Sequence, residues 1–114
     1  MCELFGISSA EKVLCNDLLK LFYSNSVNHP DGWGLATFYE NSVSIEKEPV
    51  CAVMSRYLEA RLTDTIEEDI LMAHIRKASS GGLSYNNSHP FSKRDVTGRL
   101  WTLEHNGTIF SCDE

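Results

Sequence analysis

Apolar residues recur at helical spacing in a first stretch, between residues 10 and 24. Leu14, Leu18, Leu21 and Phe22 follow one another at the intervals that place side chains on one face of a helix, while charged residues fall largely on the other side. The pattern predicts an amphipathic helix over residues 10–24 that packs on a core.

A second stretch, residues 52–62, has the same period. Here Val53, Tyr57, Ala60 and Leu62 are expected to face inward. The pattern predicts a second helix, and it follows a proline at position 49 that ends the preceding strand.

Other apolar stretches have the pattern of strands. Residues 2–8 alternate between apolar and small or polar side chains, and residues 35–39 and 43–47 flank a short polar turn, which predicts a hairpin. Residues 69–75 include the apolar run 70–73, which is typical of a strand covered on both faces.

The connections between these elements are rich in turn-forming residues. Residues 25–34 contain a Pro-Asp-Gly triplet and predict a structured loop, whereas residues 77–90 form a connection of the length that is usually functional or mobile. Residues 99–105 and 108–111 are predicted strands on either side of an Asn-Gly pair at positions 106–107.

Composition limits the classes of function. The chain has 114 residues, which suits a single domain with a core of its own. Sixteen acidic residues against ten basic ones give a formal charge of −6, and this acidic balance argues against a nucleic-acid partner or an anionic membrane surface.

The four cysteines, at positions 2, 15, 51 and 112, have neither the spacing of a Cys-x-x-Cys motif nor the density of a disulfide scaffold. We therefore expect reduced thiols. No basic region followed by an apolar run opens the chain, and no apolar stretch is long enough to span a bilayer. These features predict a soluble, cytoplasmic protein.

Cys2 is the first candidate for chemistry. If Met1 were removed, a free amine and a thiol would share one α-carbon, with pKa values of ~7.7 to 8.0 and ~8.5, so the amine could accept the thiol proton at little cost. N-terminal nucleophiles with such a built-in base are one route to covalent catalysis. The alternative is a small apolar residue at the start of a buried strand.

The pair Asn106-Gly107 also allows two interpretations. Asn-Gly between apolar strands is the strongest short-range signal for a tight hairpin turn. The side-chain amide of Asn106 and the backbone N–H of Gly107 are also two neutral donors that could bind a developing oxyanion. The two roles are compatible.

Arg76, at the end of a predicted strand, is either a solvated charge or a guanidinium that captures a carboxylate, and Ser79 could add a hydroxyl to the same anion. The histidines at positions 29, 74, 89 and 105 lack the short spacing of structural zinc sites, and His74 and His105 have the context of packed core residues. We expect no metal and no cofactor.

Five motifs together carry a resemblance to a known family. They occur in the following order: Met1-Cys2-Glu3-Leu4-Phe5-Gly6-Ile7, His29-Pro30-Asp31-Gly32-Trp33-Gly34, Ala73-His74-Ile75-Arg76-Lys77-Ala78-Ser79, Asn87-Ser88-His89-Pro90-Phe91 and His105-Asn106-Gly107-Thr108-Ile109. The order and approximate spacing resemble the class II glutamine amidotransferases, and most of all their stand-alone amidotransferase-like branch. The resemblance covers essentially all 114 residues, which look like the N-terminal part, about half, of the family's catalytic domain.

The resemblance implies a fold and a reaction. The fold would be the N-terminal nucleophile hydrolase sandwich, αββα, with two antiparallel sheets between helical layers, incomplete in this chain. The reaction would be hydrolysis of the side-chain amide of glutamine, or of a γ-glutamyl compound, through a thioester that water resolves, with release of ammonia. A synthase domain or partner would be the acceptor of that ammonia.

The resemblance also implies roles for single residues. Cys2 would be the nucleophile and its own amine the base, and Asn106 with Gly107 would form the oxyanion hole. Arg76, assisted by Ser79, would hold the substrate α-carboxylate. The loop of Gly32, Trp33 and Gly34 would line the pocket.

Two features depart from the family pattern. The family's acidic residue that binds the substrate α-amino group lies well downstream of the Asn-Gly pair, and Asp113 and Glu114 are too close to it. While Met1 remains, the nitrogen of Cys2 is an amide and cannot act as a base. The alternative function is therefore a non-catalytic or unprocessed half-domain that binds a γ-glutamyl ligand or a partner protein.

Overall fold

The computed structural model describes residues 2–79 and 82–107 of the chain. Its strands and helices are β1 (Glu3–Leu14), α1 (Asn16–Ser24), η1 (Asn25–Asn28), β2 (Gly32–Tyr39), β3 (Ser42–Glu48), η2 (Ala52–Met54), α2 (Arg56–Arg61), β4 (Glu67–Arg76), η3 (Tyr85–Asn87), β5 (Phe91–Arg94) and β6 (Leu100–Leu103), where η marks short 3₁₀ helices. The chain is α+β with antiparallel sheets, as the sequence predicted.

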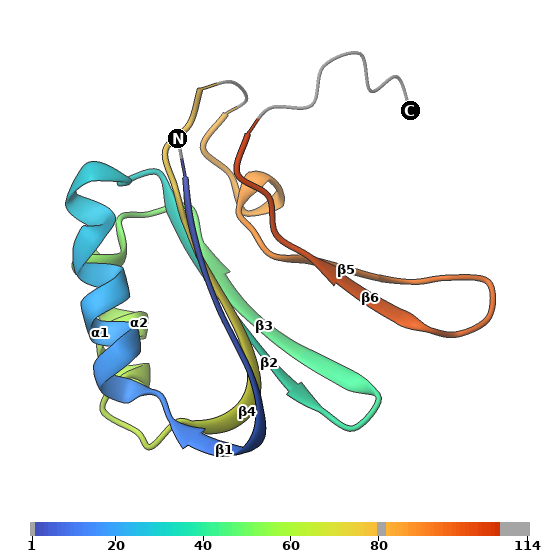
Figure 1. Cartoon of the computed structure of the whole chain (residues 1–114). Helices are drawn as coiled ribbons and strands as arrows, with labels where there is room; N and C mark the ends of the chain where they lie inside the picture. Colours follow the sequence, from blue (N-terminus) through green and yellow to red (C-terminus); the bar gives the residue numbers. More distant parts are fainter. Residues whose placement is uncertain (1, 80–81, 108–114) are drawn as a thin grey trace.

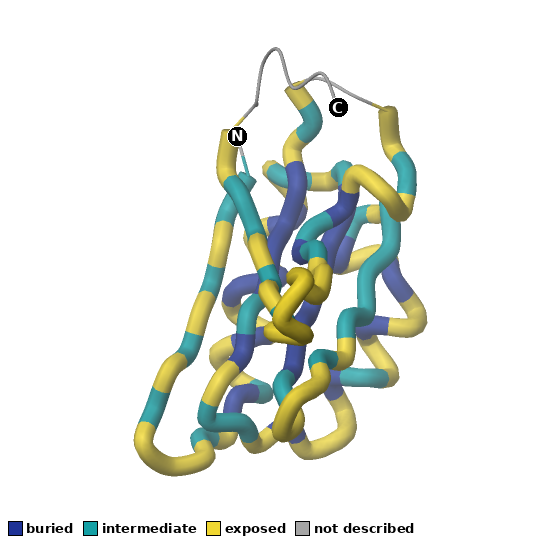
Figure 2. Tube along the Cα trace, turned by 90° about the vertical axis from the view of Figure 1, so that its right-hand side faces the viewer, coloured by how far each residue is buried: buried dark blue, intermediate teal, exposed yellow. Residues whose placement is uncertain are grey.

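A four-stranded antiparallel sheet in the order β1-β4-β2-β3 is the centre of the molecule. Helices α1 and α2 cover one face, and the two-stranded β5-β6 hairpin lies on the other side (Figure 1). The hairpin turn is exposed, and buried residues lie behind it in the orthogonal view (Figure 2). The described residues thus form a helical layer, a four-stranded sheet and a two-stranded hairpin.

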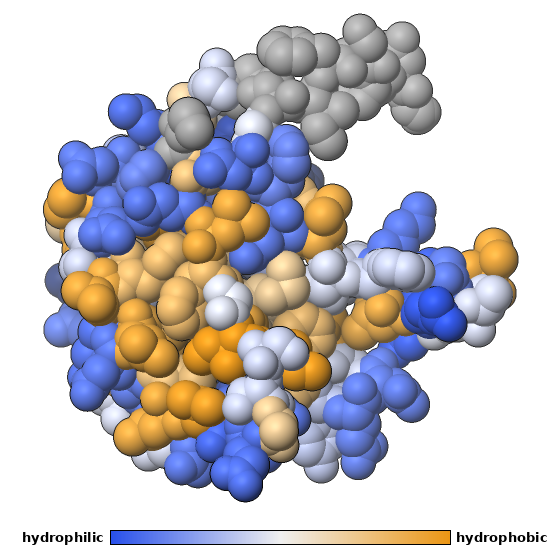
Figure 3. Space-filling view, viewed as in Figure 1, coloured by the Kyte–Doolittle hydropathy of each residue, from blue (hydrophilic) through white to orange (hydrophobic). Residues whose placement is uncertain are grey.

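The hydrophobic core lies between the helices and the sheet. Side chains of α1 and α2 pack there against those of β2 and β4 that point toward the helices. Its buried members are Cys15, Leu19, Phe22, Tyr23, Trp33, Leu35, Ala52, Leu58, Leu62, Ile66, Leu71, Ala73 and Ile75. Figure 3 shows hydrophobic side chains gathered where the helices meet the sheet, whereas the projecting hairpin turn is mostly hydrophilic.

The first helix begins later than its periodicity predicted. Strand β1 continues to Leu14, with an irregularity in its pairing between Ser8 and Val13, and α1 begins at Asn16. The Asn16 amide donates to the carbonyls of Leu62 and Asp64, and its oxygen accepts from the Ile66 N–H. This long-range contact sets the helix start.

The buried face of α1 also differs from the prediction. Leu19, Phe22 and Tyr23 are buried, whereas Leu18 and Leu21 are exposed. Because residues 9–14 extend the strand, the pattern that included Leu14 placed the inward face about one position too early.

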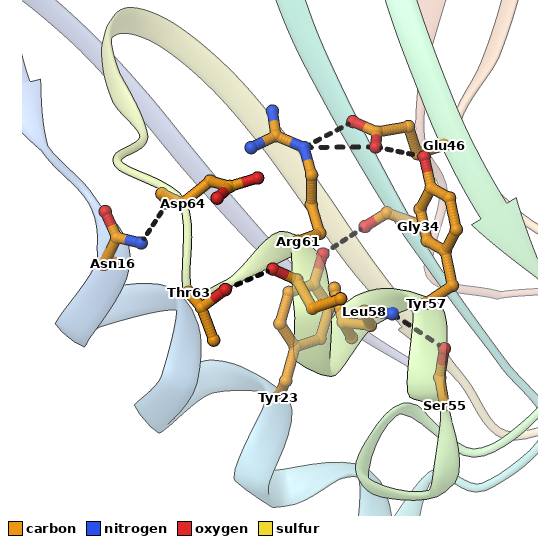
Figure 4. A network of polar contacts seen from close by, with 11 residues as sticks. Asn16, Tyr23, Gly34, Glu46, Ser55, Tyr57, Leu58, Arg61, Thr63 and Asp64 are labelled. Carbon is orange, nitrogen blue, oxygen red and sulfur yellow. Dashed lines mark hydrogen bonds and ion pairs between the residues drawn. The ribbon is translucent and has the colours of Figure 1, made fainter.

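The second predicted helix is interrupted at Ser55, which has extended backbone angles. The Ser55 hydroxyl accepts from the Leu58 N–H at 3.0 Å, so it caps α2, and it also donates to Glu48. The interruption turns Leu58 rather than Val53 and Tyr57 into the core. On the outer side, Figure 4 shows Arg61 and Tyr57 both contacting the carboxylate of Glu46 on β3.

The predicted hairpin over residues 35–39 and 43–47 is confirmed, but β2 already begins at Gly32. Gly32 and Gly34 pair with Arg76 and His74 of β4, so the end of the predicted loop is part of the sheet. The predicted strand over residues 69–75 is also confirmed as β4. The prediction that this strand is buried on both faces is wrong, because Ile70 is 45% exposed.

The end of the described chain contains an element that the sequence analysis did not predict. Strand β5 pairs with β6, and the side chain of Asp95 accepts hydrogen bonds from the N–H groups of Thr97 and Arg99 to close the turn between them. The predicted strand over residues 99–105 is shorter, and the one over residues 108–111 lies outside the described residues. In residues 2–79 and 82–107, no helix has the length and apolar character needed to cross a membrane.

Candidate active site

Three strand ends meet at one end of the four-stranded sheet. Glu3 at the start of β1 pairs with Ile75, and Gly32 at the start of β2 pairs with Arg76. Cys2 precedes β1 directly, so it lies at the same end of the sheet as Arg76 (Figure 1). The antiparallel order β1-β4-β2 therefore brings these residues together.

Cys2 contacts the other end of the described chain. Its backbone nitrogen donates to Asn106 Oδ1 at 3.2 Å, although the two residues are 104 positions apart. Because a peptide N–H can only donate, the atom of Asn106 that contacts Cys2 is its amide oxygen, and the Nδ2 group remains a donor. The Cys2 thiol lies 3.9 Å from the carbonyl oxygen of Lys77, which follows β4. Cys2, Cys15 and Cys51 are free thiols, and Cys112 lies outside the described residues.

Gly107 adopts a conformation that favours glycine. Its φ is +148°, and a Cβ at this position would approach the His105 ring to 3.0 Å. The residue type thus leaves the backbone after Asn106 without a side chain where it passes the His105 ring.

Arg76 is nearly buried, with 6% of its surface exposed, and it donates from Nη1 to the carbonyl of Gly82 at 2.9 Å. Ser79 is exposed three positions further on. Asp31, in the loop before β2, contacts the backbone of this segment twice. The Ala78 N–H donates to Asp31 Oδ2 at 2.6 Å, and the Asp31 N–H donates to the Arg76 carbonyl at 2.9 Å. Asp31, which the sequence analysis treated only as a turn former, thus fixes the backbone after β4.

The segment from Gly32 to Gly34 has a packing role in the structure. Trp33 is fully buried and lies in the core rather than beside a pocket, with its indole N–H donating to Glu48 at 2.9 Å. A Cβ on Gly34 would come within 1.7 Å of the His89 carbonyl oxygen, so only glycine allows this close approach. A Cβ on Gly32 would come within 3.0 Å of Ser88 Oγ.

Three of the histidines gather beneath Asn106. The His74 and His89 rings stack with centroids 4.4 Å apart, and the His89 and His105 centroids are 6.5 Å apart. Burial lowers the pKa of His74 and of His89 to about 4 in each case, so both are neutral at physiological pH. Within the described part of the chain, no group of His, Cys, Asp or Glu side chains could hold a metal ion.

Glu104 is a further titratable group, partly buried and close to Asn106 along the chain. It lies two residues before Asn106, and burial raises the pKa of its carboxyl to about 8. At neutral pH this carboxyl is therefore mostly protonated. No signal in the sequence distinguishes Glu104 from the other acidic residues.

Comparisons with known proteins identify the family of the chain. The family model described as "Glutamine amidotransferases class-II" matches residues 1–114. Uncharacterized protein MJ1515 of Methanocaldococcus jannaschii is 37% identical over the whole chain, which covers 32% of that relative. A protein of Escherichia coli with the provisional name glutamine amidotransferase YafJ is 34% identical over 96% of the chain and 44% of its own length.

A more distant relative has a more specific name. The glutamine–fructose-6-phosphate aminotransferase (isomerizing) of Staphylococcus epidermidis is 32% identical over 96% of the chain and 17% of its own length. The chain therefore spans less than half the length of each of these relatives. Among solved structures, none matches the chain significantly.

Proposed function

The chain belongs to the class-II glutamine amidotransferases, and from this premise we propose that it hydrolyses the side-chain amide of glutamine, or of a γ-glutamyl compound, with Cys2 as nucleophile. The observation that carries the proposal is the contact between Cys2 and Asn106. It joins the candidate nucleophile to the candidate oxyanion donor across nearly the whole described chain.

The nucleophile and its base belong to one residue. After removal of Met1, the Cys2 nitrogen is an amine, and an ordinary α-amino pKa of ~7.7 to 8.0 lets it take the thiol proton at neutral pH. The thiolate then attacks the amide carbon of the substrate and forms a C–S bond. The electron pair of the C=O bond moves to oxygen and gives a tetrahedral oxyanion.

The oxyanion is stabilised by the loop after β6. The Asn106 Nδ2 group and the Gly107 N–H are the two donors. One such donor contributes about 3 kcal/mol to the transition state. Collapse of the intermediate breaks the C–N bond, and the Cys2 ammonium returns its proton to the leaving ammonia.

The second half of the reaction resolves the γ-glutamyl thioester. The amine takes a proton from water, hydroxide adds to the thioester carbon, and collapse releases glutamate and the Cys2 thiolate, which regains the proton. Arg76, with Ser79 assisting, holds the substrate α-carboxylate throughout, because a guanidinium can make two parallel bonds to it.

The same proposal extends to the whole protein. The described helices, sheet and β5-β6 hairpin fit the first layers of an αββα sandwich with antiparallel sheets. The released ammonia would pass to an acceptor in a synthase domain or partner, in line with the name of the Staphylococcus epidermidis relative, an aminotransferase.

The experiment that tests the function compares two cysteine variants of the intact protein. Cys2→Ala should lower the release of ammonia and glutamate from glutamine by about 10⁴-fold or more, because it removes the nucleophile. Cys51→Ser is the matched control, since its thiol contacts Ser26 in another part of the molecule. Mass spectrometry of the protein from cells should show Met1 removed.

Two results would count against the proposal. Undiminished hydrolysis by Cys2→Ala would show that another residue is the nucleophile. Calorimetric binding of glutamine without any turnover by processed wild-type protein would favour a non-catalytic binding domain instead.

A further inference from the structure

The peptide group of His105 is held from both sides by histidine rings. Its N–H donates to His89 Nδ1 at 2.9 Å, and its carbonyl oxygen lies 3.0 Å from His74 Nε2. A peptide N–H can only donate and a carbonyl can only accept, so His89 Nδ1 carries no proton and His74 Nε2 carries one. The contact with His89 therefore requires a neutral ring with its proton on Nε2, whereas the contact with His74 fixes a proton on Nε2 of that ring.

The surroundings of the rings preserve that neutral state. Burial is the largest cause of the low pKa of both histidines. The groups that face His89 are His74, His105, Lys47 and Arg76, and those that face His74 are Arg76, His105 and His29. None of these side chains is negative, so any charge that they carry opposes protonation of the rings, whereas the His105 carbonyl that accepts from His74 favours it; burial outweighs that carbonyl.

Lys47 on β3 anchors the backbone on both sides of His89. Its Nζ donates to the carbonyls of Ser88 at 2.8 Å and Pro90 at 3.1 Å. The same ammonium lies 4.6 Å from the ring centroids of both Tyr85 and Phe91, within the range of cation–π attraction. On the neighbouring strand β2, Gly34 allows the His89 backbone to approach closely.

From these contacts we propose that His74, His89 and Lys47 are positioning residues that hold Asn106 and Gly107 where they can bind the oxyanion. Lys47 fixes His89 to the sheet, the two histidines fix the His105 peptide, and Asn106 follows directly. The inference rests on the proposed function. Its physical reason is that oxyanion donors act only when they are held in place before the reaction.

Matched pairs of variants test the hydrogen bonds separately from ring packing. His89→Asn keeps an acceptor near the position of Nδ1, whereas His89→Phe keeps a ring and removes the acceptor. His74→Gln keeps a donor near the position of Nε2, and His74→Phe removes it. The measurement is steady-state hydrolysis of glutamine by the intact, processed protein at pH 7.

We expect each Phe variant to lose about 100-fold in kcat, the effect of one displaced oxyanion donor. The KM for glutamine should change by less than about threefold, because Arg76 holds the substrate α-carboxylate independently. The Asn and Gln variants should recover most of the rate. Equal rates for the two members of a pair, or losses that appear in KM rather than kcat, would overturn the proposal.

Two measurements separate failure of this inference from failure of the proposed function. The rate of Cys2 alkylation by iodoacetamide should be the same in all variants, since the nucleophile is untouched. Hydrogen exchange of the His105 amide should be slow in wild type and in His89→Asn and fast in His89→Phe, whether or not glutamine is hydrolysed. A His105 amide that exchanges equally in these three proteins would contradict the inference even for an inactive protein.

Discussion

The two faces of the four-stranded sheet differ in chemistry although they share the same strands. On β4, Leu71, Ala73 and Ile75 point into the apolar core beneath the helices, whereas His74 stacks on His89 on the opposite side. One strand of alternating residues thus serves a packed core and an active site at once. The alternation separates residues that hold the fold from residues that hold the chemistry.

The two faces also differ in how well their polar groups are satisfied. Among the described residues, three buried side-chain atoms make no hydrogen bond: His74 Nδ1, Thr102 Oγ1 and Glu104 Oε2. All belong to β4 or to the segment that contains β6, away from the helices. A buried polar group without a partner costs about 1–3 kcal/mol of stability. The apolar core under the helices therefore offsets a loss of stability on the opposite face of the sheet, which carries the candidate site and is called the site face below.

The largest difference in stability between the two faces is expected for substitutions at two neighbouring residues of β4. Leu71→Ala should lower the free energy of unfolding by about 2–5 kcal/mol, because it leaves a cavity in the core beneath the helices. The kcat of this variant for glutamine should equal that of wild type under conditions in which the variant is still folded. Ile70→Ala, at a position that is 45% exposed on the other face, is the control and should cost about 1 kcal/mol or less.

Chemical denaturation together with steady-state kinetics measures both quantities. A Leu71→Ala variant that loses kcat as much as stability would show that the two faces are not independent.

Glu104 should make the site face dependent on pH. The folded protein keeps this proton up to about pH 8, while the unfolded chain loses it near pH 4.5. Between these values the folded state binds more protons, so the free energy of unfolding falls as pH rises. Glu104→Gln should abolish this fall and be more stable than wild type at pH 7.

Denaturation curves at pH 4.5, 6 and 7.5 would check this, with the exposed Glu11→Gln as control. Parallel pH profiles for wild type and Glu104→Gln would disprove the effect.

The histidines change stability with pH in the opposite direction. In the unfolded chain His74 and His89 are protonated below about pH 6.5, whereas in the folded state they are protonated only below about pH 4. Their contribution to stability is complete above pH 6.5 and is lost as pH falls toward 4.

Replacement of Arg76 by lysine keeps the positive charge and leaves the apolar core unchanged, so it tests the proposed binding of the substrate α-carboxylate. Arg76→Lys should raise the KM for glutamine by about 10- to 100-fold, because an ammonium cannot make the paired bonds of a guanidinium. The change in kcat should be smaller. Arg56→Lys, on the exposed side of α2, is the matched control and should leave both constants unaltered. An Arg76→Lys variant with wild-type KM would remove Arg76 from the binding site.

The smallest effect is expected at the helix cap on the opposite face. Ser55→Ala should lower the free energy of unfolding by about 1 kcal/mol, because the Leu58 N–H loses its acceptor. Ser24→Ala is the control, since its exposed hydroxyl bonds only back to Leu21 of its own helix. Thermal denaturation of both variants measures the difference, and equal melting temperatures would show that this cap contributes nothing.

Local pattern was enough to predict some elements and not others. The β2-β3 hairpin and β4 follow from their own residues, because alternation and turn formers are local signals. The start of α1 depends on Asn16 contacts with residues nearly fifty positions away, and the break at Ser55 depends on a cap. Neither could be obtained from hydrophobic period alone.

The candidate site divides in the same way. Cys2, Arg76 and Asn106-Gly107 were found because their residue types suit a specific reaction. Lys47, His89 and Asp31 were missed because they act on backbone groups of distant segments, and backbone carbonyls and N–H groups leave no trace in a sequence. Trp33 was expected at the pocket because the family resemblance places the loop of Gly32, Trp33 and Gly34 there, and in the structure its side chain lies in the core.

The hydrogen bond from the Cys2 nitrogen to Asn106 Oδ1 also bears on maturation. An amide oxygen accepts equally well from a peptide N–H and from a primary amine, so the acceptor is satisfied before and after Met1 is removed. Under the proposed function, the precursor would thus already hold its future base in contact with Asn106. Processing would then switch on basicity at an atom that stays in place, and activation would need an aminopeptidase but no refolding.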